Sequence, residues 1–198
     1  MTLKSMSLAA AAVAIVALLV VGLLQLGSSS DATSSQPQRL TLAQVRARLA
    51  GSPTALAALH AQAGQILSGG LPAVRARLSA LHGTPVVVNK WASWCEPCRA
   101  EFGVFQHVSV SRGREVAFIG IDSGDTSRFA AQSFLRSFPV GYPSYYDASG
   151  RAGAAVTDSS FTPVTVFFSR GGRLFIHQGP YPTVAKLERD VRRYALEA

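Results

Sequence analysis

Short apolar runs alternate with amphipathic stretches along the second half of the chain, and this alternation sets the class of fold. Residues 85–91 (PVVVNKW) and 116–121 (VAFIGI) are runs of the kind that forms buried central strands. Residues 164–168 and 173–177 flank a Gly-Gly pair, which is a signal for a hairpin turn. Strands that alternate with helices and end in a hairpin predict a mixed α/β sheet with helices on both faces.

Stretches with helical periodicity occupy the gaps between these runs. Residues 96–110 follow the first strand directly, and residues 126–138 precede a strand expected near 144–146. After a turn, a short helix is expected to end at Val156. The amphipathic stretch 183–196 closes the chain as a last helix. Upstream, apolar residues recur at helical spacing in two groups: Leu42, Val45 and Leu49, and then Leu71, Val74, Leu78 and Leu81.

An uncharged apolar segment lies near the start of the chain, at residues 7–26. Its length matches the ~20 apolar residues that a helix needs to cross the hydrocarbon layer. Lys4 precedes the segment and Asp31 is the first charged residue after it, so the positive-inside rule places the N-terminus in the cytoplasm. The sequence therefore predicts a single-pass cell-membrane protein whose folded part lies on the extracytoplasmic side.

The chain divides into three predicted parts. Residues 1–26 are a cytoplasmic start and transmembrane signal anchor, residues 27–39 a polar flexible linker, and residues 40–198 a folded domain. A cleaved signal peptide is the alternative, because small residues follow Leu26. We favour the anchor, since the apolar cores of signal peptides usually run only ~7–15 residues.

The formal net charge of +8 raises the question of a nucleic-acid partner. The arginines are spread along the chain rather than gathered in one run, which argues against nucleic-acid binding. Solvated basic faces, with a weak attraction to an anionic membrane surface, explain the charge better.

The only two cysteines, Cys95 and Cys98, are separated by two residues. A zinc site needs about four ligands at set spacings. The four histidines form no paired motif, so no metal is predicted. A structural disulfide across so short a loop would remove little entropy from the unfolded chain. Redox chemistry is the role that remains, in a compartment where disulfides persist.

The place of these cysteines along the chain supports that chemistry. Cys95 lies where the strand 85–91 ends and a helix begins, so the unpaired N–H groups and the helix dipole favour its thiolate. Pro97 suits the first turn of a helix, because its φ is already fixed and it has no N–H to satisfy. Cys98, one turn further in, is expected to be more buried. Cys95 is therefore the predicted attacking thiol and Cys98 the resolving thiol.

Residues 91–102 (WASWCEPCRAEF) resemble the active-site segment of the thioredoxin superfamily, and more closely that of the membrane-tethered TlpA/ResA-type thiol-disulfide oxidoreductases. Residues 161–165 (FTPVT) are a second match, and the resemblance covers residues 84–196. It is weaker over residues 40–83, where only the order of elements fits. The resemblance implies a thioredoxin-like three-layer α/β/α fold with a mixed central sheet. Within residues 125–156 it implies a TlpA-type insertion of a strand and a helix.

Several site residues follow from the resemblance. Pro163 matches the family's cis-proline, which faces the active-site sulfurs, and the backbone of Thr162 before it pairs with a bound substrate strand. Trp94 and Pro97 belong to the surface on which a substrate docks, whereas Trp91 serves packing.

Two glutamates near the cysteines have different implied roles. Glu101 lies three residues after Cys98, and the resemblance implies that it handles protons near the thiols. A solvated glutamate stabilised by the helix dipole is the alternative for Glu101. Glu96 is expected to be exposed, where its charge tunes the reduction potential of the cysteine pair.

Two residues before the cysteines depart from the usual patterns. Asn89 stands where thioredoxin has a buried aspartate, and this replacement of the aspartate is common in TlpA-like proteins. An amide has no titratable proton, so Asn89 cannot have an acid-base role. Lys90 replaces the usual phenylalanine on a central strand, where a buried ammonium group is costly unless it is paired. We hypothesise that Lys90 reaches a carboxylate or carbonyl group near the site and biases thiol ionisation. The alternative is that its side chain extends to an edge.

These features predict an extracytoplasmic thiol-disulfide oxidoreductase whose redox group is the Cys95–Cys98 disulfide, with no other cofactor. The resemblance implies that it reduces exported proteins with cysteines, such as apocytochrome c in cytochrome c maturation. It also implies a membrane electron donor of the CcdA or DsbD type that re-reduces the protein. A disulfide-donating oxidase or isomerase keeps the fold and reverses the electron flow. A thiol peroxidase and a noncatalytic binding module are the alternatives from other classes.

Overall fold

The structure is a computed structural model that describes residues 39–172 and 174–198. The predicted signal anchor over residues 1–26 and nearly all of the predicted linker over residues 27–39 lie outside the described residues. Within the part that the structure describes, no helix is both long enough and apolar enough to span a membrane.

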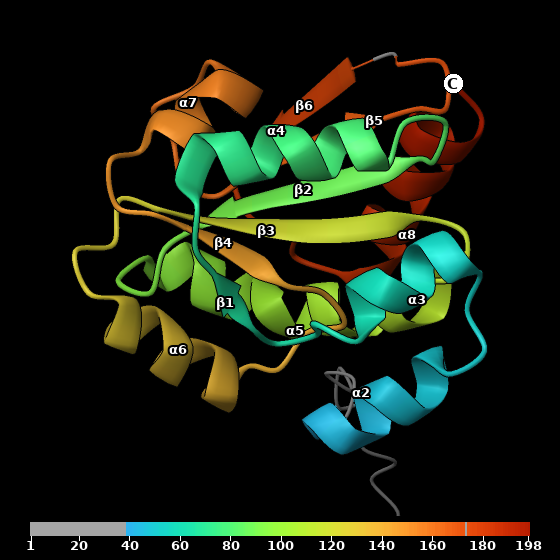
Figure 1. Ribbon diagram of the computed structural model, residues 1–198, viewed down its shortest axis with the longest axis horizontal. Helices are drawn as coiled ribbons and strands as arrows, with labels where there is room; N and C mark the ends of the chain where they lie inside the picture. The colour runs from blue at the N-terminus through green and yellow to red at the C-terminus, as the bar shows by residue number, and fades with distance from the viewer. Residues whose placement is uncertain (1–38, 173) are drawn as a thin grey trace, which may run out of the picture. The chain divides into compact units, whose positions relative to one another are not determined.

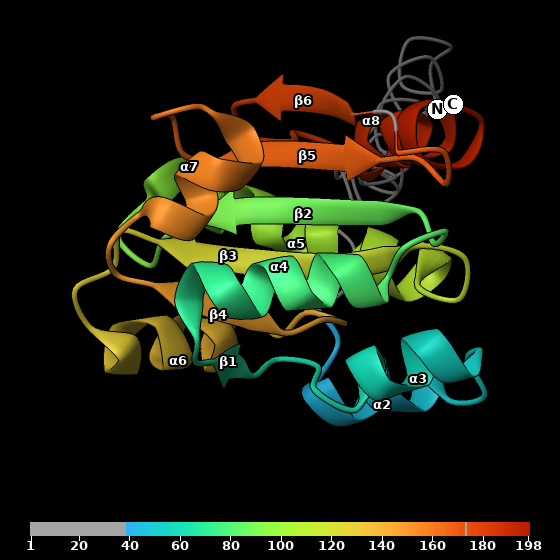
Figure 2. The same cartoon turned by 45° about the horizontal axis from the view of Figure 1, so that its top comes forward.

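One mixed sheet of six strands runs through the domain (Figure 2). Its strands are β1 (Ile66–Leu67), β2 (Val86–Trp91), β3 (Ala117–Ser123), β4 (Ser144–Asp147), β5 (Val164–Phe168) and β6 (Leu174–Gln178). They lie in the order β1-β4-β3-β2-β5-β6. The first four are parallel, while β5 pairs antiparallel with β2 and β6 antiparallel with β5. The central strands β2 and β3 are buried along their whole length, as their apolar composition predicts.

Helices cover both faces of this sheet, which makes three layers (Figure 1). In chain order they are α2 (Leu42–Leu49), α3 (Thr54–His60), α4 (Gly70–Ala80), α5 (Glu96–Arg112), α6 (Arg128–Ser137), α7 (Arg151–Thr157), α8 (Val184–Asp190) and the π-helical turn η1 (Val191–Leu196). The apolar residues of α4 and α7 pack on one face, and those of α5, α6 and α8 on the other. The predicted thioredoxin-like fold with a mixed sheet is confirmed.

The apolar cluster under α5, α6 and α8 is rich in aromatic rings. The ring of Trp91 lies 5.1 Å from that of Phe102 and 4.9 Å from that of Phe134. Such contacts add to the free energy gained by burying large apolar side chains. Because Trp91 ends β2 and Phe102 lies on α5, the cluster fixes the helix that follows the cysteines against the central strand.

The segment between β3 and β5 contains the insertion that the resemblance implies. It holds α6, β4 and α7, and β4 takes a place in the sheet between β1 and β3. The predicted bounds, 125–156, enclose α6 and β4 fully, and α7 ends one residue later at Thr157.

Three elements differ from the sequence prediction. The sequence does not predict β1, because two residues are too few to show a periodic pattern. It does not predict α3 either, because the buried apolar stripe of this helix consists of Leu56 and Leu59 alone. The last helix is not regular to its end, because η1 follows α8. There the N–H of Glu197 donates to the carbonyl of Arg192, five residues back, at 2.9 Å.

The topology gathers distant segments at one edge of the sheet. The carboxyl ends of the parallel strands β2, β3 and β4 lie at the same edge, which we call the carboxyl edge. β5 runs antiparallel to β2 with Val164 opposite Lys90, so it begins at this edge too. Cys95, Asp122 and Pro163 are therefore brought to one side of the domain.

Candidate active site

The cysteine pair lies at the carboxyl edge, where β2 leads into α5. Cys95 is the N-cap residue of α5, and a disulfide joins it to Cys98 in the first turn, with Pro97 between them. The backbone N–H of Cys98 donates to the Cys95 sulfur at 3.2 Å. Cys95 is 3% exposed and Cys98 0%, so Cys98 is the more buried, as predicted. The Cys95 sulfur thus lies at the positive end of a helix dipole, where a thiolate is stabilised.

A second segment of the carboxyl edge carries a cis proline. The Thr162–Pro163 peptide bond is cis, as the resemblance implies. Because Val164 pairs with Lys90, Pro163 lies level with the last residue of β2. Pro163 is buried, while Thr162 is half-buried. The backbone before Pro163 therefore lies beside the strand that leads to the cysteines.

Two large apolar side chains at this edge are exposed. Trp94 is 65% exposed and directly precedes Cys95, and Phe161 is 64% exposed and lies two residues before Pro163. Exposed aromatic side chains are enriched on surfaces that bind other proteins. The role of Trp94 in docking a substrate stays a prediction, and the sequence analysis does not single out Phe161.

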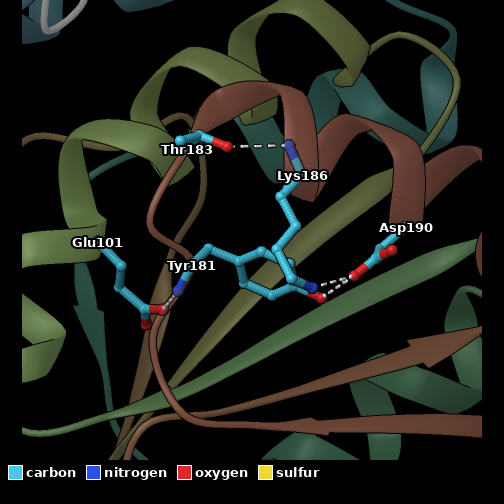
Figure 3. Close-up of polar contacts among 5 residues, drawn as sticks. All are labelled: Glu101, Tyr181, Thr183, Lys186 and Asp190. Carbon is cyan, nitrogen blue, oxygen red and sulfur yellow. Dashed lines mark hydrogen bonds and ion pairs between the residues drawn. The ribbon is translucent and has the colours of Figure 1, made fainter. Parts of the chain in front are cut away.

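Glu101 is buried in the interior of the domain, so the alternative of a solvated glutamate is wrong. Its Oε2 accepts a hydrogen bond from the backbone N–H of Tyr181 at 3.0 Å (Figure 3). No donor reaches its Oε1. Burial raises the pKa of Glu101 to about 8, although the Tyr181 N–H and the Asn89 side chain favour the charged form. Glu101 therefore holds a proton at neutral pH in the oxidised protein.

The partner of Glu101 is itself held by a polar group on α8. The Tyr181 hydroxyl donates to Asp190 at 2.9 Å, and the Lys186 ammonium lies 3.0 Å from the same carboxylate oxygen (Figure 3). Thr183 caps the start of α8 by accepting from the Lys186 backbone N–H at 3.2 Å. These contacts fix the Tyr181 backbone, and with it the orientation of Glu101.

Asn89 is buried beside this acid and carries no titratable proton. Its Nδ2 donates to the Tyr142 hydroxyl at 3.5 Å, but its Oδ1 has no donor. A buried acceptor without a donor costs free energy. Asn89 Oδ1 and Glu101 Oε1 are two such acceptors, so a proton on Glu101 relieves part of this cost. The sequence analysis does not identify Tyr142, which lies 53 residues from Asn89.

A second buried carboxyl group, Asp122 near the end of β3, was not predicted from the sequence. Asp122 is 0% exposed, and no donor reaches either of its oxygens. Burial raises the pKa of Asp122 to about 9, with further contributions from Asp125 and Asp147. Asp122 therefore stays protonated at neutral pH.

Asp125 links this carboxyl group to the cysteine segment. Its carboxylate accepts from the Ser93 N–H at 2.8 Å and from the Ser93 hydroxyl at 2.9 Å. The side-chain interaction between Asp122 and Asp125 favours the protonated form of Asp122. Ser93 lies two residues before Cys95, so the buried acid pair helps to fix the segment that carries the attacking sulfur. The signal in the sequence is the pair of aspartates that follows an apolar run.

Lys90 is 5% exposed, and its ammonium binds two carbonyl groups. Nζ donates to the carbonyl of Ser159 at 2.6 Å and to that of Phe161 at 2.9 Å. Burial lowers the pKa of Lys90, and the nearby Asp147 carboxylate opposes this shift. The expectation that Lys90 reaches a carbonyl is confirmed, while its effect on thiol ionisation stays a prediction.

Glu96 is exposed, as predicted, and forms an ion pair with Arg99 at 3.4 Å. Solvent screens such a pair, so its contribution to stability is small. The effect of the Glu96 charge on the reduction potential of the cysteine pair stays a prediction. Among residues 39–172 and 174–198, no group of three His, Cys, Asp or Glu side chains could hold a metal ion.

Comparisons with known proteins agree with this geometry. The Redoxin family model matches residues 67–186, which run from β1 into α8. The thiol-disulfide oxidoreductase ResA of Bacillus subtilis (strain 168) is 31% identical over 104 residues. These residues make up 50% of this chain and 55% of ResA, so the chain spans about half the length of this curated relative.

Two solved structures share the fold. The MTB dsbF protein, in its mixed oxidized and reduced forms, is 28% identical with a TM-score of 0.55, covering 59% of this chain and 85% of dsbF. A secreted Mycobacterium tuberculosis disulfide oxidoreductase homologous to E. coli DsbE is 26% identical with a TM-score of 0.50. That match covers 58% of this chain and 83% of the other.

Proposed function

This chain belongs to the Redoxin family, and on that basis we propose that it is a thiol-disulfide oxidoreductase that acts on exported proteins outside the cytoplasm. The observation that carries the proposal is the Cys95–Cys98 disulfide at the start of α5, together with the cis Thr162–Pro163 peptide bond at the same edge of the sheet. A thiolate at a helix N-terminus is a good nucleophile toward a disulfide. The half-buried Thr162 segment before Pro163 is the surface on which a partner would lie.

The proposed direction is reduction of the partner. The Cys95 thiolate attacks one sulfur of a partner disulfide, so a mixed disulfide forms and the second partner sulfur leaves as a thiolate. The Cys98 thiolate then attacks the Cys95 sulfur, which forms the Cys95–Cys98 disulfide and releases the first partner sulfur. Two electrons pass to the partner, and its two leaving thiolates take up the proton that Cys98 loses and one proton from solvent.

Glu101 is the proposed proton carrier of the opposite half-cycle, in which a donor re-reduces the protein. A donor thiolate that attacks Cys95 expels Cys98 as a thiolate, one helical turn from Glu101. The pKa of Glu101 is about 8 in this oxidised form, so a proton is available there at neutral pH. Asn89 holds no proton to give, and its part is to hydrogen-bond.

The proposed location is the outer side of the cell membrane. The apolar segment 7–26 supports a signal anchor. The relative from Mycobacterium tuberculosis is a secreted disulfide oxidoreductase, which supports work outside the cytoplasm. Apocytochrome c as one exported substrate and a CcdA or DsbD type donor in the membrane are proposed from the TlpA/ResA resemblance of the sequence. A tether keeps the protein at a high effective concentration near such a donor.

Trapping with Cys98→Ala tests the exchange chemistry. Without the resolving thiol, Cys95 should stay linked to its partner, so disulfide-bonded adducts should accumulate on non-reducing gels and vanish with dithiothreitol. The matched control is Cys95→Ala, which keeps one thiol but removes the attacking one and should trap far less. A thiol peroxidase or a noncatalytic module would give no enrichment of Cys98→Ala adducts over this control.

The equilibrium reduction potential of the full chain tests the direction. A reductant should have a potential near or below that of thioredoxin, ~−270 mV, measured against dithiothreitol buffers. A potential near −120 mV, the region of strong disulfide donors, would instead make the protein an oxidase of its partners. The measurement uses the Cys95–Cys98 pair alone, because the chain has no other cysteine.

A further inference from the structure

Lys90 is the one strongly polar side chain on β2 whose contacts the proposed chemistry does not use. It is 5% exposed, and a buried ammonium group is costly unless hydrogen bonds replace its water. Both of its hydrogen bonds go to backbone carbonyls, those of Ser159 and Phe161. In the described part of the chain, no carboxylate lies within 4.0 Å of its ammonium as an ion pair. The hydrogen bonds of Lys90 therefore hold backbone, while the Asp147 carboxylate acts on it only from beyond ion-pair distance.

The backbone that Lys90 holds is the loop 158–162, which joins α7 to β5. Lys90 and Ser159 are 69 residues apart in sequence, so these hydrogen bonds tie the loop to the central strand. Within the loop, Phe161 N–H donates to the Ser159 hydroxyl at 3.2 Å, which shapes the turn locally. The Gln178 side chain on β6 reaches the same hydroxyl at 3.4 Å. Neither contact links the loop to β2.

The Lys90 carbonyl partners precede Pro163 by four and two residues. Fixing the Phe161 carbonyl sets the plane of the peptide group between Phe161 and Thr162. The direction in which the Phe161 side chain emerges follows from this backbone. Phe161 is 64% exposed, at the same carboxyl edge as Trp94.

We infer that Lys90 is a positioning residue that fixes the loop 158–162. With the loop fixed, the Thr162 backbone and the Phe161 ring together bind the partner. The partner is an extended polypeptide that carries an apolar side chain beside its cysteine. The inference rests on the proposed function and names the class of partner that the site takes. Main-chain hydrogen bonds would bind the extended segment, and the aromatic ring would bind its apolar side chain. A small disulfide has neither feature, so its reaction does not depend on the loop.

The variant Lys90→Met in the full chain tests the inference, because methionine keeps the length of the side chain but removes the donors. The probe is a short peptide with one cysteine, blocked as a glutathione disulfide, beside a leucine. We expect the second-order rate with this peptide to fall about tenfold through a higher KM, the scale of lost hydrogen bonds from a charged donor. The rate with the small linear disulfide bis(2-hydroxyethyl) disulfide should change less than twofold.

Arg77→Met is the matched control for loss of a partly buried cation. Arg77 on α4 also binds neutral oxygens, the Tyr145 hydroxyl at 2.7 Å and Gln62 at 2.6 Å, but not the loop. It should leave both rates within twofold of the wild type. Amide hydrogen exchange gives a second readout, because residues 159–162 should exchange faster in Lys90→Met than in Arg77→Met, whatever the loss of overall stability.

Two results would overturn the inference. Equal slowing of the reactions with the peptide and with bis(2-hydroxyethyl) disulfide, with a changed Cys95 thiol pKa, would show that Lys90 acts on the sulfur. Unchanged peptide kinetics and unchanged exchange of the loop amides would show that Lys90 positions nothing. Failure of the proposed function is distinct, since the wild type itself would then exchange no disulfide with either probe.

Discussion

Asp122→Asn is expected to be roughly 4 kcal/mol more stable than the wild type at pH 7, and about as stable at pH 3. The pKa of Asp122 is raised from 3.8 in the unfolded chain to about 9 in the folded one. Below the unfolded pKa both states hold the proton. Above it the unfolded state ionises first, so wild-type stability falls by about 1.4 kcal/mol per pH unit until the folded group also ionises. An amide does not ionise, so the variant has no such loss.

Urea unfolding between pH 3 and pH 8, followed by tryptophan fluorescence, measures this difference. The control is Asp158→Asn, an exposed aspartate at the end of α7 with φ 48°, a conformation that asparagine also accepts. It should change stability by less than about 0.5 kcal/mol at every pH. A loss of stability in Asp122→Asn at pH 7 would mean that the folded protein uses the charged carboxylate, contrary to the assignment.

Glu101→Gln is expected to stabilise the oxidised protein by roughly 3 kcal/mol at pH 7 while slowing its reduction. The pKa of Glu101 is raised from 4.5 to about 8, so the stability that its neutral form provides is complete below pH 4.5 and is lost as the pH rises toward 8. The introduced amide stays neutral and accepts from the Tyr181 N–H through its oxygen, as the carboxyl group does.

The kinetic arm of this substitution separates proton transfer from packing. An amide cannot give a proton to the Cys98 thiolate, so reduction of the disulfide by dithiothreitol at pH 7 should slow roughly 100-fold, the low end for general acid catalysis. The reduction rate of the wild type should change with pH around pH 8, where Glu101 titrates, and this change should be absent from the rate of the variant. Glu115→Gln, an exposed glutamate near Arg112, should alter neither stability nor rate appreciably. If Glu101→Gln is stabilised but reacts at the wild-type rate, Glu101 does not transfer a proton to the sulfur and its role is structural.

Local patterns are enough to predict the class of fold and the reactive pair. The apolar runs at β2, β3 and β5 are strong signals because a buried strand needs side chains that suit both faces. Cys95 and Cys98 are predictable as redox groups because the strand-to-helix junction is a local feature that places a sulfur at a helix N-terminus. The cis conformation before Pro163 was available from the resemblance and not from the chain's own pattern.

The environments of the ionisable groups were decided by tertiary structure alone. Glu101 at its helical position fits a solvated or a buried side chain equally well, and the Tyr181 segment, 80 residues away, covers it. The sequence marks Lys90 as a buried ammonium group that needs a partner, but only the fold brings the Ser159 carbonyl within 2.6 Å of it.

The same holds for the acid pair of Asp122 and Asp125. Burial that shifts a pKa depends on all the atoms around a group, and these come from segments far apart in sequence. The class of fold and the two reactive sulfurs were thus predictable from the sequence, because neighbours along the chain signal both. Only the packed domain decided which acids keep their protons and which loop Lys90 holds, because desolvation and hydrogen-bond geometry exist only once distant segments meet.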